Sequence, residues 1–320
     1  MVLFGHKHKF YYLCIRKTEQ SMKVVRKSIN EVIGSVKGGN RTQQTIRCMD
    51  VGSDFMHRNF SSDMYIDAVT TILVARGPLQ LEINRTTVTA DTGSVVVLSP
   101  AHTVRLAECS PALRCILLMV GEEFMSDTDS VDMIYKRIRY GVKLFDRPVV
   151  KLSADRMMLL CDRMRDIQRA IDNTAHLYHH DVVLNRLYAF YLDLSDIIDR
   201  TENPDNSEHT ARYESIVKGF IELLTANFRT EHKVGFYAAK LNMSAHYLTL
   251  IVKEVTGRSV SDFIFGMLYS DARALLTESQ MSVQEIAMLL NFSDQSAFGK
   301  FFKRHSGVSP LDYRKRLFLE

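Results

Sequence analysis

The pattern of hydrophobic and polar positions divides the chain at about residue 148. From about residue 45 to 120, apolar residues form short runs or alternate with polar ones, and the expected strands are 69–75, 79–84, 86–90, 94–99 and 115–120. Turn-forming pairs such as Gly77-Pro78 and Asn84-Arg85 separate these runs. Several short strands joined by tight turns predict a small β-barrel or jelly roll.

After Pro148 the period of the apolar positions becomes helical. Ser153 is placed to cap a first helix, and a second helix is expected over 180–198. The apolar stripe of the second helix consists of Val183, Leu184, Leu187, Tyr191, Leu194 and Ile198. This stripe could pack on the barrel or on a second copy of the chain, so the helical pair is also a candidate dimerisation element.

A repeat in the last third of the chain carries the most information. Val234 to Ser244 precedes an amphipathic run that ends at Gly257, and Val283 to Ser293 precedes a similar run that ends at Gly307. Each copy predicts a short helix, a polar break and a second helix closed by glycine. This is the pattern of a helix-turn-helix motif, whose second helix enters the major groove of DNA.

The segment between the two copies predicts a long connecting helix over residues 260–278. A helix of this length spans roughly 28 Å at ~1.5 Å per residue. Successive major-groove faces of B-DNA lie ~34 Å apart. The connecting helix is therefore expected to hold two recognition helices on one side of a duplex.

The second copy resembles the signature of the AraC/XylS family. The residues that carry the likeness are Ala272-Arg-Ala-Leu-Leu, the capping box Ser282-Val-Gln-Glu-Ile-Ala, and Asn291-Phe-Ser-Asp-Gln-Ser-Ala-Phe-Gly-Lys-Phe-Phe-Lys-Arg-His-Ser-Gly-Val-Ser-Pro-Leu-Asp-Tyr-Arg314. The resemblance covers about residues 213–316. It implies a transcription regulator that acts with RNA polymerase, with a cupin-like N-terminal domain that senses a small ligand or dimerises.

The resemblance also assigns the DNA contacts. The positions that read bases in this family correspond here to His246, Thr249, Leu250, Gln295, Ser296, Ala297 and Lys300. Lys253, Lys300 and Lys303 have the chemistry for phosphate contacts. Two residues depart from the family pattern: Leu250 stands where a basic residue is usual, and Asn291 replaces the usual glycine of the turn. Asn tolerates the left-handed conformation that this turn requires.

The expected fold is a multidomain α+β protein, with the following division. We expect a basic N-terminal extension without regular structure at 1–44, a cupin-like β domain at 45–148, the helical pair at 149–200, a linker at 201–210, and a DNA-binding domain at 211–320 with helix-turn-helix motifs at about 234–255 and 283–305. Met22 is an alternative start of the chain. Strand alternation suggests a ligand pocket inside the barrel, lined by Ile72, Val74, Leu81, Ile83, Val97, His102 and Leu117.

Composition agrees with a DNA-binding role without proving it. The chain of 320 residues is 46% hydrophobic and 24% charged, with a net charge of +4. Its five cysteines are scattered without a CxxC pair, which favours a reducing cytoplasm over a disulfide framework. No apolar run has the length of a membrane helix.

Two other interpretations remain open from the sequence. The first is a cupin-type enzyme with an incidental helical tail. His102 is the only histidine in residues 69–120, and this segment has no His-x-His metal motif. No catalytic residue, cofactor or metal is therefore expected. The second is a dimeric module that sequesters a partner regulator and does not bind DNA, to which Leu250 gives slight support.

Overall fold

The computed structural model describes residues 24–34, 40–121, 124, 144, 147–200 and 208–317. Its N-terminal half contains two five-stranded sheets, as expected for the barrel or jelly roll. One sheet has the order β1 (Val25–Lys27), β3 (Met64–Ile66), β8 (Thr103–Cys109), β5 (Leu79–Ile83), β6 (Thr86–Ala90). The other has the order β10 (Val149–Lys151), β7 (Ser94–Leu98), β4 (Ala68–Arg76), β9 (Arg114–Gly121), β2 (Ile46–Gly52).

The two sheets enclose a core of apolar side chains. Leu81 and Ile83 of the first sheet belong to one buried cluster with Ile72 and Val74 of the second. The turn between β5 and β6 has Asn84 at φ 50° and Arg85 at φ 67°. Two successive positive φ angles are the geometry of a tight hairpin turn whose twist matches that of the strands.

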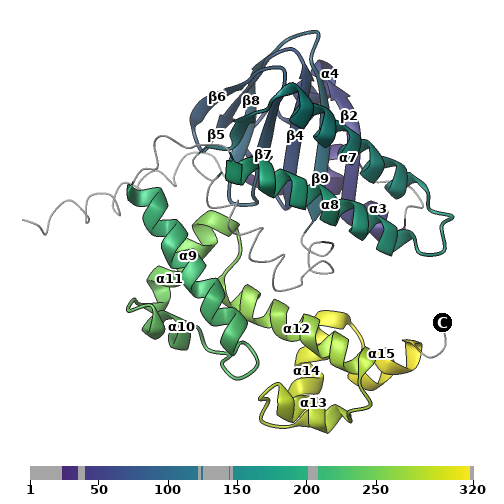
Figure 1. The fold of residues 1–320 in the computed structure, drawn as a ribbon, viewed down its shortest axis with the longest axis vertical. Helices are drawn as coiled ribbons and strands as arrows, with labels where there is room; N and C mark the ends of the chain where they lie inside the picture. Colours follow the sequence, from purple (N-terminus) through teal and green to yellow (C-terminus); the bar gives the residue numbers. More distant parts are fainter. Residues whose placement is uncertain are drawn as a thin grey trace, which may run out of the picture.

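The opposite face of the second sheet is covered by two helices, α7 (Ala154–Asp172) and α8 (His179–Arg200). Figure 1 shows both helices lying across β4, β7 and β9. Leu73 of β4 and Ile116 of β9 point to this side and share a buried cluster with Leu160 and Leu187 of the helices. Burial on both faces explains why these strands are almost continuously apolar.

The apolar stripe of α8 packs within the chain. Val183, Leu187, Tyr191, Leu194 and Ile198 are between 0% and 4% exposed, and Leu184 is half-buried against the same cluster. Of the two partners considered from the sequence, the barrel and α7 therefore take up the stripe.

The first strand and two short helices belong to the β domain, although we expected residues 1–44 to be an extension without regular structure. β1 pairs in parallel with β3. Helices α2 (Ile29–Ile33) and α3 (Arg41–Thr45) follow it, and Ile29 is buried in the core between the sheets. A parallel pairing across nearly 40 residues is invisible to local sequence patterns. Residues 1–23 lie outside the described part of the chain.

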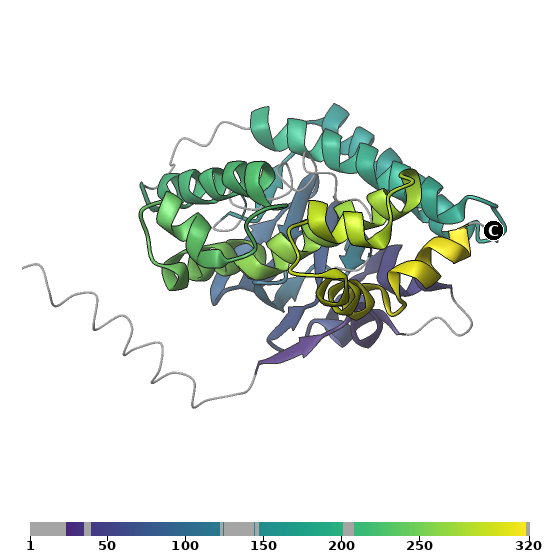
Figure 2. The same ribbon diagram turned by 90° about the horizontal axis from the view of Figure 1, so that it is seen from below.

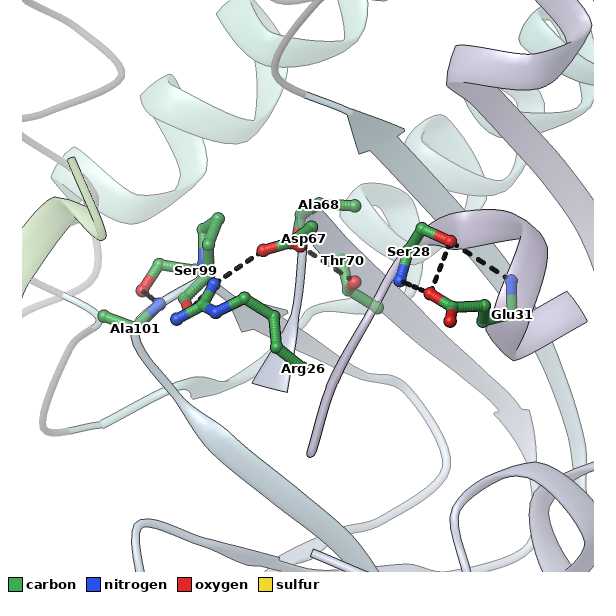
Figure 3. A network of polar contacts seen from close by, with 9 residues as sticks. Arg26, Ser28, Glu31, Asp67, Ala68, Thr70, Ser99 and Ala101 are labelled. Atoms are coloured by element: carbon green, nitrogen blue, oxygen red, sulfur yellow. Dashed lines mark hydrogen bonds and ion pairs between the residues drawn. The ribbon is translucent and has the colours of Figure 1, made fainter. Parts of the chain in front are cut away.

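Polar contacts fix this N-terminal segment to the sheet. Arg26 of β1 donates a hydrogen bond to the Asp67 carboxylate, with a nitrogen–oxygen distance of 2.6 Å. Ser28 and Glu31 form a capping box at the start of α2. Figure 3 shows the Arg26–Asp67 contact beside Ser99 and Ala101, and the Ser28–Glu31 capping box apart from it at the start of the helix. A further short helix, α4 (Ser53–Asn59), follows β2.

The C-terminal half is helical and has its own core. Its helices are α9 (Glu208–Asn227), α10 (Val234–Lys240), α11 (Ala245–Thr256), α12 (Val260–Glu278), α13 (Val283–Leu289), α14 (Gln295–Ser306) and α15 (Pro310–Leu317). Their buried residues form a single hydrophobic cluster. In Figures 1 and 2, α12 runs from the group α9–α11 to the group α13–α15. Its bounds confirm the connecting helix predicted at 260–278.

The two helical pairs have matching turns and ends. Asn242 and Asn291 lie in the turns at φ 54° and 55°, so asparagine does adopt the left-handed conformation at both positions. Gly257 and Gly307 close α11 and α14, each at φ 77°. The turn between α13 and α14 is one residue longer than the turn between α10 and α11. The N-cap of the second helix is Ser244 in the first pair and Asp294 in the second.

Substitution of Leu187 by alanine tests the packing of α8 on the β domain. Its side chain is fully buried, and truncation of a buried leucine leaves a cavity. Leu187→Ala should therefore lower the free energy of unfolding by about 2–5 kcal/mol. The half-buried Leu184 on the same helix is the control, and Leu184→Ala should cost clearly less in urea denaturation. Equal costs would contradict this packing.

The cap of α14 gives a pH-dependent prediction. The Ala297 N–H donates to Asp294 at 2.7 Å, and this hydrogen bond, aided by Ser293, holds the pKa of the Asp294 carboxyl below its usual range. A lowered folded-state pKa stabilises the fold above the ordinary carboxyl value of about 3.9, and this stabilisation is lost as the pH falls below that value. Asp294→Asn keeps a capping side chain but cannot titrate. The difference in melting temperature between the wild type and this variant should shrink between about pH 7 and pH 3. A difference that is constant with pH would contradict the charged cap.

Candidate nucleic-acid interface

The two recognition helices, α11 and α14, are each held by one buried face. Both are 12 residues long. Leu248, Ile251 and Val252 of α11 are fully buried, as are Phe298 and Phe302 of α14. These are inward positions that the helical period predicted. Since the inward face fixes the rotation of each helix, it also fixes which side chains face outward.

All nine predicted DNA contacts lie on the outward parts of these two helices. His246, Leu250, Lys253, Gln295, Ser296, Lys300 and Lys303 are exposed, and Thr249 and Ala297 are half-buried. The structure thus brings the predicted residues together into two separate surfaces, one on each helix. The side chains are accessible to a duplex at both.

The outward surface of α14 is more basic than that of α11. Lys300 and Lys303 of α14 are followed by Arg304, which is also exposed. The corresponding positions of α11 are Leu250, Lys253 and Glu254. Sequence reasoning missed Arg304, although alignment of the two repeats would have placed it opposite Glu254. The second helix is therefore better suited than the first to approach a polyanion.

Contacts between the two units fix their relative orientation. Arg229, which follows α9, forms two hydrogen bonds of 2.7 and 2.8 Å with the Asp271 carboxylate of α12. The Asn291 side chain in the second turn donates to the Thr230 carbonyl at 2.6 Å. The ring of His232 lies 5.2 Å from that of Phe292. The loop after α9 therefore packs against the second unit, in addition to the connection through α12.

Five of the predicted ligand-pocket residues face the space between the two sheets. Ile72, Val74, Leu81, Ile83 and Leu117 belong to that core and are at most 3% exposed. The prediction was wrong for Val97, whose side chain packs on the other face, beneath α7 and α8. The sheet pairs Ile72 with Val96 and Thr71 with Val97. Because paired residues share a face, Val96 is the neighbour of Ile72.

His102 lies in the loop between β7 and β8 and is nearly fully buried. Its Nδ1 accepts a hydrogen bond of 2.9 Å from the Ser99 N–H. This contact holds the loop in shape.

Among the described residues, no cluster of three or more His, Cys, Asp or Glu side chains is placed to bind a metal. No helix in the described part of the chain is long and apolar enough to span a bilayer.

The loop between β7 and β8, which contains His102, also touches the end of the first recognition helix, α11. A Cβ atom added at Gly257 would lie 3.1 Å from the Pro100 Cβ and 3.2 Å from the Ala101 nitrogen. A Cβ atom added at Gly307, the matching residue of the second unit, would meet nothing within 4 Å. The β domain therefore contacts the first unit at a position where the second unit is open.

Comparisons with known proteins agree with this geometry. Residues 237–316 match the family model of a helix-turn-helix domain. The melibiose operon regulatory protein of Escherichia coli K12 is 33% identical over 116 residues, 36% of this chain and 37% of its own length. The Msm operon regulatory protein of Streptococcus mutans is 27% identical over 136 residues, 42% of this chain and 48% of its own length.

The chain spans less than half the length of the first curated relatives that it matches, between 16% and 48%. Among solved structures, the DNA-binding domain of AdpA in complex with a target DNA is 25% identical, with a TM-score of 0.29 over 32% of this chain and 90% of that one. ToxT from Vibrio cholerae is 12% identical, with a TM-score of 0.31 over 85% of this chain and 98% of that one. On the family match and the sequence relatives, the C-terminal part of this chain is an AraC-type helix-turn-helix domain, related to the AraC-family regulators.

Proposed function

We propose that this chain is a sequence-specific transcription regulator that binds duplex DNA through α11 and α14 in successive major grooves. The observation that carries the proposal is the pair of matching recognition helices, both exposed on their outward faces and both built on one core. The helix-turn-helix family match over 237–316 supports it. The named relatives are operon regulators, which favours a regulator over an enzyme.

The N-terminal domain is the proposed modulator of DNA binding. The contact of Pro100 and Ala101 with Gly257 supports this, because it joins the β domain to the end of α11. A small effector bound between the sheets would act only if it bound the DNA-competent state and the other state with different affinity. A homodimer, RNA polymerase as a partner and a cytoplasmic location are parts of the same proposal. They rest on the family likeness alone.

In vitro selection from random duplex DNA tests the proposal. The full chain, at near-physiological salt, should enrich a motif with two blocks about one helical turn apart. One enriched block would show that a single unit reads sequence. No enrichment would contradict DNA recognition and favour the module that sequesters a partner regulator.

Lys300→Ala tests whether the second recognition helix reads a base. Lys300 is exposed on the outward face of α14. If its ammonium contacts a base edge, its loss should cost on the order of 1–3 kcal/mol of binding and relax specificity at one position. Fluorescence anisotropy with the selected duplex and its single-base variants measures both. An unchanged binding curve would remove Lys300 from the interface.

Leu250→Arg tests the weaker first unit. Leu250 is 40% exposed and occupies the position that matches Lys300. A guanidinium at this position gains phosphate and base-edge contacts that leucine lacks, so the variant should bind the selected duplex more tightly. Leu250→Ala, which adds no charge, should not tighten binding. Weaker binding by Leu250→Arg would show that Leu250 makes an apolar contact of its own.

A further inference from the structure

The first recognition helix lacks a positive charge that the second one carries. Lys253 of α11 is followed by Glu254, whereas Lys303 of α14 is followed by Arg304. DNA phosphates line both edges of the major groove, so a carboxylate on one flank of the helix opposes binding there. If the first unit enters a groove as the second does, it needs a cation on the Glu254 flank from another element.

Helix α9 lies along this flank of α11. The Tyr213 hydroxyl of α9 donates a hydrogen bond of 3.4 Å to the Glu254 carboxylate. Burial, and then the Glu254 charge, raise the pKa of Tyr213 to about 12, so the hydroxyl keeps its proton. This contact places the first turns of α9 beside Tyr247 and Glu254, which lie on the same side of α11 at positions i and i+7.

Arg212 comes from the same turn of α9 and reaches the start of α11. Its guanidinium carbon lies 6.0 Å from the centre of the Tyr247 ring, and the side chain is exposed. Together with Ser215 it borders an open depression of about 560 Å³. The other wall of the depression is the first turn of the helix-turn-helix, including Asn242 and Ser244. The depression thus lies beside the N-terminal end of α11, whose N-cap is Ser244.

We propose that this depression receives the DNA backbone, and that Arg212 binds a phosphate beside the groove that α11 enters. The inference rests on the proposed function. An α-helix of about 10–12 Å diameter fills a major groove about 12 Å wide, so elements beside the helix face the phosphates. The planar guanidinium matches the geometry of a phosphate. The neutral cap Ser244 admits an anion here, whereas the second unit has the carboxylate of Asp294 at the equivalent place.

The salt dependence of binding tests the proposal. The logarithm of the binding constant falls with the logarithm of salt concentration by about 0.9 for each phosphate contacted. Arg212→Ala should therefore reduce this slope by roughly one contact and weaken binding equally for different sequences. Arg212→Lys should retain the slope of the wild type. The measurement is fluorescence anisotropy of the full chain with the selected duplex and with a random-sequence duplex about three turns long.

Lys218→Ala is the matched control, because Lys218 is an exposed cation of α9 that is paired with Glu222 and does not border the depression. It should leave the slope unchanged. Thermal melts should show that both alanine variants fold as the wild type does. If Arg212→Ala keeps the wild-type slope while the wild type binds DNA, the phosphate contact is wrong and the proposed function stands. If the wild type binds neither duplex, the proposed function itself fails.

Discussion

Seven apolar side chains of α12, from Val260 to Leu276, are buried in one core to which both helix-turn-helix units contribute. Each of the six that are larger than alanine gains roughly 1.5–3 kcal/mol from burial, so a hinge in α12 would expose apolar surface at high cost. The ion pair between Arg229 and Asp271 ties the loop after α9 to α12, and the hydrogen bond from Asn291 to the Thr230 carbonyl ties the same loop to the second unit. The two recognition helices are therefore presented as one rigid pair.

Because the two recognition helices are held together, the difference in charge between their outward surfaces bears on how both approach a duplex. The second helix has Lys300, Lys303 and Arg304 on its outward surface, and the first has Leu250, Lys253 and Glu254. If the helices moved independently, the weaker one could remain off the DNA. Because α12 holds them together, the first helix is brought to the duplex whenever the second one binds. The contact of Gly257 with Pro100 places the β domain against the first unit, whose recognition helix has fewer outward cations than the second.

The sequence predicted the C-terminal half more closely than the N-terminal half for physical reasons. The bounds of α12 were correct because Ser259 caps its start and the apolar period ends at Glu278. In the β domain, pairing across long separations sets the structure. β1 was missed because its partner β3 is nearly 40 residues away. Val97 was assigned to the wrong face because the register between β4 and β7 decides it.

The candidate site also contains residues that the sequence predicted and residues that it missed. The outward positions of α11 and α14 follow from helical periodicity, and all nine predicted residues are accessible or half-buried as expected. Arg304 could have been predicted from the repeat, because it occupies in α14 the position that Glu254 occupies in α11. Arg212 was not, because its place beside Tyr247 depends on how α9 packs against α11. Tertiary contacts of this kind leave no local pattern in the sequence.

The most direct test of a rigid pair is the spacing of the two half-sites. In a duplex that carries both selected blocks, an insertion of about five base pairs turns one block to the opposite side of the helix, and about ten restore the side but add a full turn of distance. A rigid α12 predicts that both insertions reduce the affinity to that of a duplex with one block. Affinity that survives either insertion would contradict the account, because the two recognition helices would then have to move independently.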